Sequence, residues 1–332
     1  MQIVVSCDYL VSPAFCDSST LDTKIKDLVN LKREIDGANP RATIESDALL
    51  KLTALGYYPS TSLFKQNFAA NESTEFSIKD VTKVVYHLAS LTVEDEDFFP
   101  DCIAYWNNKS IAPNIEGCSH ERSQAICELV EKVFLVNHFH GKEFSILHHP
   151  LESNHKSVVF SGELTNSIPE TPPPLPVSLQ DSIAVFSEYS DFLSQFDATS
   201  AYSSAQNPED IEEALTLGAI AIAKNSGKSG IRKFEFGAAF IDSLYAHQSA
   251  PQQRFANTAF DVICHVIAGV EKYPHNPMYS DLDKKIQKIK DGKLAWRTHV
   301  TTGNPALRFM YWSGDGGLTL ANIGNKKDLE IF

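Results

Sequence analysis

One histidine and several arginines lie on two predicted strands in the last part of the chain. Arg297 and His299 are two residues apart within the segment 294–301, whose pattern is typical of a strand. Because side chains alternate between the faces of a sheet, these two should point the same way. Arg308 lies at the start of the next predicted strand, 307–313. If the two faces coincide, an imidazole lies among guanidinium groups.

Further basic residues and an aromatic ring flank this set. Lys326 and Lys327 follow the last predicted strand, 318–323, where the chain leaves the sheet. Lys290 and Lys293 lie just before the strand predicted at 294–301. Trp312 shares a face with the arginine of its own strand. Lysines contact phosphates, and aromatic rings stack on nucleobases. We therefore predict RNA contacts for Lys327, Lys293, Lys290 and Trp312.

This combination of side chains suits the cleavage of RNA without a metal ion. That reaction needs a base for the 2′-hydroxyl, positive charge for the developing phosphorane, and an acid for the leaving 5′-oxygen. Arginine fits the second role because its planar fork matches phosphate oxygens and keeps its charge. An imidazole can serve as base or acid near neutral pH. The predicted catalytic set is His299, Arg308, Arg297 and Lys326, with no metal and no cofactor.

The elements that must position these residues follow a simple order. Strands are predicted at 234–236, 294–301, 307–313 and 318–323. Two helices with apolar stripes fall between the first strand and the other three. Ser249 and Gln252 form a capping box at the start of the second helix, whose stripe runs from Phe255 to Val270. Turn residues at 302–305 and 313–317 join the last three strands into hairpins. Two helices against an antiparallel sheet predict an α+β domain.

The preceding part of the chain is predicted to be a larger, α-rich α/β domain. Serines that can cap helices precede apolar residues at helical spacing, at Ser19, Ser46, Ser77 and Ser119. A proline-rich stretch from Pro169 to Pro176 marks the clearest internal boundary. We therefore predict a regulatory or docking domain at 1–168, a Pro-rich linker with a connecting helix at 169–229, and the C-terminal domain at 230–332.

Composition restricts the class of protein. The chain has 332 residues, 29 basic and 42 acidic, for a net charge of -13. From Asn225 onward, 14 basic residues face 10 acidic ones, so the excess of acid lies before that point. No apolar run approaches the roughly 20 residues of a membrane span. Six thinly spread cysteines fit reduced thiols, and we expect a cytoplasmic protein with no membrane contact.

The C-terminal pattern resembles the RelE/ParE toxin superfamily. The resemblance rests on the order of elements and on the pieces LAWRTHV, ALRFMYW and LANIGNKKDLEIF, and covers roughly 100 residues. It aligns Arg297 and His299 with basic positions of the family's second strand, Arg308 with the third-strand arginine, and Lys326 with the residue after the fourth strand. Phe332 stands where several members carry a tyrosine, and it cannot donate a proton.

The resemblance implies an mRNA interferase, a toxin that cleaves mRNA on the ribosome and arrests translation. Its implied partners are mRNA and the ribosome, with an antitoxin, or a small-molecule or nucleotide activator, acting through the N-terminal domain. A homodimer is left open. Fusion to a large acidic half resembles CRISPR-associated effectors of antiviral defence, in which a CARF sensor precedes a RelE-like RNase. The strand MQIVVSCDYL is compatible with such a sensor's start. The alternatives are a ParE-like inhibitor of gyrase and a non-enzymatic interaction protein.

Other motifs have simpler interpretations. The run Asn225–Gly230 contains the GKS of a phosphate-binding loop but lacks its first glycine, since Ile222 stands there, and it follows a predicted helix. Scattered cysteines and histidines between 118 and 149 lack the spacing of a zinc site. Asp8 would suit a PIN-type nuclease only if further carboxylates join it. The acidic run 94–97 fits a solvated loop or a docking segment.

Overall fold

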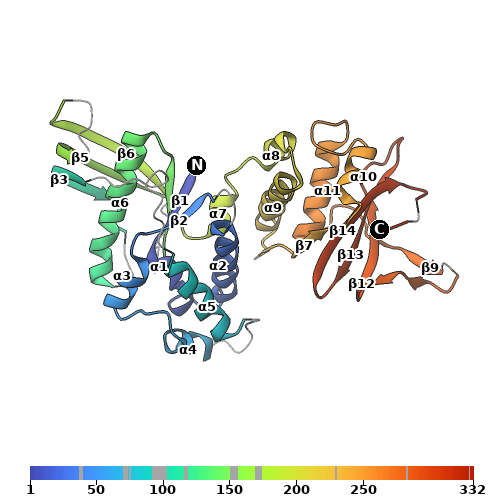
Figure 1. Cartoon of the computed structure of the whole chain (residues 1–332), viewed down its shortest axis with the longest axis horizontal. Coiled ribbons are helices and arrows are strands. Elements are labelled where there is room, and N and C mark those ends of the chain that lie inside the picture. Colours follow the sequence, from blue (N-terminus) through green and yellow to red (C-terminus); the bar gives the residue numbers. More distant parts are fainter. Residues whose placement is uncertain are drawn as a thin grey trace. The chain divides into compact units, whose positions relative to one another are not determined.

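The computed structural model describes the chain except for residues 37–39, 70–73, 75, 92–102, 116–118, 150–155, 169–173, 229, 282 and 329. The chain divides into two compact units, Met1–Phe192 and Leu193–Phe332 (Figure 1). Each unit combines helices with a sheet, which confirms the predicted mixture of the two kinds of element. The acidic run 94–97 lies outside the described residues.

A mixed sheet forms the centre of the first unit. Its strands are β1 (Gln2–Val5), β2 (Ala42–Ile44), β3 (Ile103–Ala112), β4 (Phe144–Leu147), β5 (Ser157–Ile168) and β6 (Val177–Phe186), in the order β2-β1-β4-β6-β5-β3. Strands β2, β1, β4 and β6 are parallel, and β5 and β3 extend the sheet in antiparallel fashion. Short strands that are buried along their whole length, such as β4, suit a parallel sheet that is covered on both faces.

Helices surround this sheet. They are α1 (Cys7–Leu10), the 3-10 turn η1 (Ser12–Ala14), α2 (Leu21–Ile35), α3 (Ala48–Ala54), α4 (Thr61–Ala69), α5 (Ile78–Ala89), α6 (His120–His140) and α7 (Tyr189–Leu193). Ser77 and Ser119 cap α5 and α6 as predicted, since each side chain accepts a hydrogen bond from a backbone N–H of the first turn. Figure 1 shows α6 beside β5 and β6, where Phe134 packs against Phe160.

The predicted linker at 169–229 needs correction. Val177–Phe186 forms β6, which pairs with both β4 and β5, so the proline-rich stretch joins two neighbouring strands of the first unit. The boundary lies at Phe192, and the connecting helix belongs to the second unit. The prolines therefore mark a connection within one sheet, which a proline-rich composition alone does not distinguish from a linker between domains.

The second unit has the element order expected from the sequence, with additional helices and short strands. Its helices are α8 (Ala198–Ser204), α9 (Pro208–Asn225), α10 (Phe240–Ala246) and α11 (Ala256–Ala268). Its strands are β7 (Phe234–Phe236), β8 (Asn276–Pro277), β9 (Tyr279–Asp281), β10 (Ile286–Gln287), β11 (Ile289–Lys290), β12 (Lys293–His299), β13 (Leu307–Gly314) and β14 (Gly317–Asn325). The main sheet has the order β11-β12-β13-β14-β7, with β7 parallel to β14 and β8 pairing with β12.

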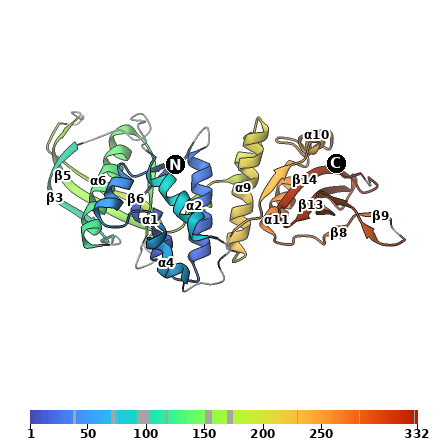
Figure 2. The same cartoon turned by 60° about the horizontal axis from the view of Figure 1, so that its bottom comes forward.

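The helices pack on one face of this sheet. Residues of α9, α10 and α11 share a buried apolar cluster with Phe309, Tyr311 and Leu320 of the sheet. Figure 2 shows α9 alongside α11. A Cβ added at Gly218 of α9 would lie 2.6 Å from the Cys264 sulfur, so only glycine allows this approach. Helix α9 is therefore part of the core of the second unit.

The new boundary also changes the charge of the second unit. The residues from 193 to 224 add one lysine and five carboxylates, so 15 basic residues face 15 acidic ones from Leu193 onward. The first unit has the remaining 14 basic and 27 acidic residues. The second unit as a whole is neutral, and any attraction for phosphate must come from where its cations lie.

Candidate functional site

Three of the four predicted catalytic residues lie on the face of the second sheet that turns away from the helices, which we call the outer face. His299 of β12 is directly opposite Arg308 of β13, and Arg297 is opposite Met310. The next residues along β13, Phe309 and Tyr311, point into the helix-covered core. Alternation on antiparallel strands therefore brings the imidazole and the two guanidinium groups together.

Arg308 is held in place by a neighbouring loop. Its side chain is buried, and Nη1 donates to the carbonyl oxygens of Thr301 at 3.2 Å and Leu307 at 2.8 Å. Burial and the nearby Arg297 lower the pKa of Arg308. Within the described part of the chain, no carboxylate forms an ion pair with either guanidinium group. A buried cation without a counter-charge is a favourable site for an anion.

His299 lies where it can accept a proton. Burial lowers its pKa, and the positive charges of Arg308, Lys326 and Arg297 lower it further. The imidazole is therefore neutral at pH 7. Its Nδ1 is shielded from solvent and makes no hydrogen bond among the described residues. A neutral, partly buried imidazole next to cations has the properties of a general base for a reaction at a phosphate.

Lys326 joins the cluster from the end of β14. Its backbone N–H donates to Ala306 O at 2.8 Å, which places it beside the loop that holds Arg308. The side chain is exposed to solvent. Lys327 is also exposed, but it is not among the charges that lower the pKa of His299. Arg297, His299, Arg308 and Lys326 therefore form one group, which we call the cation cluster.

The other predicted RNA-binding residues lie elsewhere. Lys293 is at the opposite end of β12, about 20 Å from His299 for a strand of this length. Its ammonium group donates to Glu235 at 2.8 Å and to Thr319 at 2.7 Å, so it already has a counter-charge. The ammonium of Lys290 lies 6.0 Å from the ring of Trp312. Lys290 and Lys293 thus lie at the far end of the strands, whereas Trp312 is opposite Ala295, two residues along β13 from the Met310 that is opposite Arg297.

Trp312 is covered in this structure. Its side chain is only 5% exposed, and its indole N–H donates to Phe332 O at 3.0 Å. Ile331 packs on the same apolar group. The indole ring is therefore not accessible to a nucleobase while residues 330–332 lie across it. Tyr311 cannot compensate for the missing tyrosine at 332, since it is buried on the opposite face with its hydroxyl 2.6 Å from His275 Nδ1.

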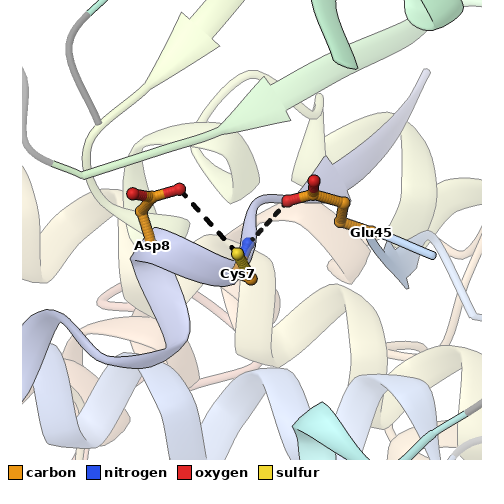
Figure 3. Close-up of side chains that lie close together, drawn as sticks. All are labelled: Cys7, Asp8 and Glu45. Atoms are coloured by element: carbon orange, nitrogen blue, oxygen red, sulfur yellow. Dashed lines mark hydrogen bonds between the residues drawn. The ribbon is translucent and has the colours of Figure 1, made fainter. Parts of the chain in front are cut away.

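A second polar cluster lies in the first unit, at the carboxyl ends of its parallel strands. Cys7 and Asp8 follow β1, and Glu45 follows β2 (Figure 3). The ligand atoms of these three residues lie within 4.8 Å of one another. Arg122, from the first turn of α6, bonds to Asp8 at 2.5 Å and to Glu45 at 3.0 Å. Ser6, between β1 and Cys7, shares through its Oγ a hydrogen bond of 2.9 Å with His148, which follows the neighbouring strand β4.

This cluster does not fit a metal ion. Arg122 and Lys51, whose ammonium lies 2.8 Å from Glu45 Oε1, already balance the two carboxylates, and Cys7, Asp8 and Glu45 are almost fully buried. Burial raises the pKa of the Cys7 thiol, which would have to lose its proton to bind a metal. The PIN-type interpretation of Asp8 thus gains a second carboxylate but not a metal site. Among the described residues, the cysteines and histidines between 118 and 149 form no metal-binding group.

The GKS segment is a helix end. Helix α9 ends at Asn225 with Ser226 as its C-cap, Gly227 has a positive φ of 71°, and the Lys228 N–H donates back to Ala223 O at 2.9 Å. A phosphate-binding loop precedes a helix, where free N–H groups point at the ligand. Here the chain leaves a helix, so the rejection of a phosphate-binding loop at this segment is consistent with the geometry.

Asn322 is a polar residue of the outer face that the sequence patterns did not single out. This amide is buried in the outer face of β14 and contacts residues 330–332. The signal for it is a polar side chain inside the apolar run LTLANI.

Among the described residues, no helix is long and apolar enough to cross a membrane. Comparisons with protein-family models, with curated proteins and with solved structures found no match.

Proposed function

We propose that the second unit is an endoribonuclease that cleaves RNA without a metal ion. The 2′-oxygen attacks the adjacent phosphorus, the P–O5′ bond breaks, and a 2′,3′-cyclic phosphate forms. His299 takes the proton of the 2′-hydroxyl, and the leaving 5′-oxygen takes a proton from solvent. Arg308 and Arg297 stabilise the charge on the phosphorane, and Lys326 positions the phosphate.

The observation that carries this proposal is the cation cluster itself. Three positive groups surround one neutral imidazole, and each of them lowers its pKa. The loop bonds of Arg308 fix its guanidinium before any ligand arrives. Fixed charge at the place where negative charge develops is the largest contribution in many enzymes of this kind. A site that only binds phosphate has no need for a proton acceptor among its cations.

The resemblance to RelE-like toxins gives the substrate. The order β7, α10, α11, β12, β13, β14 is the one expected of that superfamily, and the four family positions coincide with the cation cluster. On that basis the substrate is mRNA on the ribosome, and cleavage arrests translation. A toxin or a defence effector of the cytoplasm is the corresponding biological role.

The first unit is proposed to control the nuclease. It is a separate compact unit with a strong excess of acidic residues, and the four parallel strands of its mixed sheet suit a Rossmann-like sensor of the kind fused to RelE-like domains. A small molecule, a nucleotide or an antitoxin protein would act through it. A chain that starts at Leu193 should then cleave mRNA faster than the full chain. Equal rates would contradict control by the first unit.

Cleavage of a defined mRNA in a reconstituted translation system tests the nuclease. Arg308→Ala should lower the cleavage rate about 10²- to 10³-fold. Arg254→Ala is the matched control, since Arg254 is exposed and lies outside the cation cluster. An intact message with the wild-type chain, with or without the first unit, would refute the proposal. RNA or gyrase binding without cleavage would instead favour a protein that only binds.

A further inference from the structure

A buried amide lies on the outer face beside the cation cluster. Asn322 is 4% exposed and is opposite Met310 in the pairing of β13 with β14. The pairing shifts at this point, because Tyr311 is opposite Leu320 and one extra residue, Ala321, lies between. Such a bulge redirects a side chain. Here it leaves both Ala321 and Asn322 on the outer face, where Ala321 packs with Met310.

The amide of Asn322 bonds to the backbone of residues 330–332 through both of its polar atoms. Nδ2 donates to Glu330 O at 3.4 Å, and Oδ1 accepts from the Phe332 N–H at 3.4 Å. One donor and one acceptor side by side are what asparagine uses to bind adenine through N7 and the 6-amino group. The backbone of residues 330–332 thus presents the same pair of groups as the edge of that base. Both bonds are long, and therefore weak.

The surroundings of Asn322 suit a flat ring. Met278, Ala295, Met310, Trp312 and Ala321 form a small apolar cluster, and Ile331 is the residue packed against it. Trp312 contributes an indole ring, whose N–H is bonded to Phe332 O. Single-stranded RNA is recognised by aromatic rings that stack on bases and by polar groups that bond to base edges. Residues 330–332 now occupy the position that such a base would take.

Asn322 lies within the span of one nucleotide from the cation cluster. Arg308 is opposite Gly324, two residues along β14 from Asn322, so Asn322 and Arg308 are diagonal neighbours at about 7–8 Å. On the other side, Met310 separates Asn322 from Arg297. A phosphate bound by Arg308 would therefore leave an adjacent base within reach of Asn322.

We propose that residues 330–332 cover a nucleobase site, and that adenine of the bound RNA displaces them and pairs with Asn322. The proposal rests on RNA as the ligand of the cation cluster, and adds a base preference to it. The covering segment is held by the two long hydrogen bonds of Asn322, by the Trp312 N–H bond to Phe332 O at 3.0 Å and by the packing of Ile331, and the base that displaces it replaces these contacts. Removal of this segment should then strengthen RNA binding.

Binding of short 2′-O-methyl oligonucleotides, which cannot be cleaved, tests the base site apart from the nuclease. A chain that ends at Asp328 should bind oligoadenylate several-fold more tightly than the full chain does. In that shortened chain, oligoadenylate should bind roughly tenfold more tightly than oligouridylate. Asn322→Leu should abolish the difference and leave the oligouridylate affinity unchanged. Ile331→Ser in the full chain loosens the cover without shortening the chain and should act in the same direction.

The outcomes separate this proposal from the nuclease. Equal affinity for the two oligonucleotides in both the shortened chain and Ile331→Ser would overturn the base site, whatever the cleavage assay gives. A preference for adenine that survives Asn322→Leu would also overturn it. Arg308→Ala should weaken both oligonucleotides equally, since it contacts phosphate. A preference for adenine in a chain that does not cleave RNA would support the base site and refute only the nuclease.

Discussion

Asp27 makes the stability of the first unit depend on pH in a direction opposite to that of most carboxylates. It lies on α2, is 4% exposed, and its Oδ2 accepts hydrogen bonds from the Tyr9 hydroxyl and the Tyr189 N–H, both at 2.9 Å. Burial raises its pKa to about 6, although these two bonds and the charge of Lys24 act against the rise. In the unfolded chain an aspartate has a pKa of about 3.9.

The direction of this pH dependence follows from proton binding at Asp27. Between about pH 4 and pH 6 the folded chain binds more protons at Asp27 than the unfolded chain does, so the free energy of unfolding falls as the pH rises. The stabilisation is complete below the unfolded pKa and is lost as the pH passes the folded one. A difference of about two pKa units corresponds to about 3 kcal/mol.

Asp27→Asn isolates this contribution. Asparagine has the same shape and an oxygen that can accept both hydrogen bonds, but no charge. Its advantage in unfolding free energy over the wild type should grow by about 3 kcal/mol between pH 4 and pH 7 and then level off. Calorimetry of both proteins at each pH measures the difference, and other titrating groups cancel. Asp17→Asn, exposed in the same unit, controls for the loss of one charge. A difference that does not vary with pH would refute the reasoning.

Two further predictions concern the second unit. The rate of RNA cleavage should fall at acid pH, and the midpoint of this fall should lie below the usual pKa of histidine. Arg297→Gln should move the midpoint to higher pH, because it removes a positive neighbour of His299. A midpoint that stays in place would exclude His299 as the base. Gly218→Val should destabilise the second unit by about 1–3 kcal/mol, since its Cβ would overlap the Phe260 ring. Its unfolding temperature should drop by several degrees, and the same drop for Thr216→Val on that helix would argue against the close contact.

The sequence predicted the second unit well because its patterns are local. Alternation along β12 and β13 was enough to place Arg297, His299 and Arg308 on consistent faces. It could not show that His299 is opposite Arg308, since register depends on the loop between the strands. The second helix begins at Ala256 and not at Ser249, because Gln253 bonds to the Ala250 N–H in a turn before it.

The features that the sequence did not predict depend on contacts between residues that are distant in the sequence. The sequence did not predict that β6 pairs with β4 and β5, because strand pairing depends on contacts throughout the sheet. The ion pairs of Arg122 join α6 to the ends of β1 and β2, more than 70 residues apart in sequence, and no spacing rule predicts them. Asn322 could be noticed as a polar residue in an apolar strand, but the bulge that directs it outward is visible only in the pairing of β14.

The pairing of β7 with β14 has a consequence for how the second unit folds. Glu235 and Thr319, which face each other across these strands, are separated by 84 residues. The hairpins of β12, β13 and β14 close short loops and can form early, whereas β7 can join only after a long loop has closed. Until then the edge of β14 is open, with its backbone groups unpaired. During that interval β14 is the strand most exposed to pairing with another chain, so aggregation on refolding should begin there.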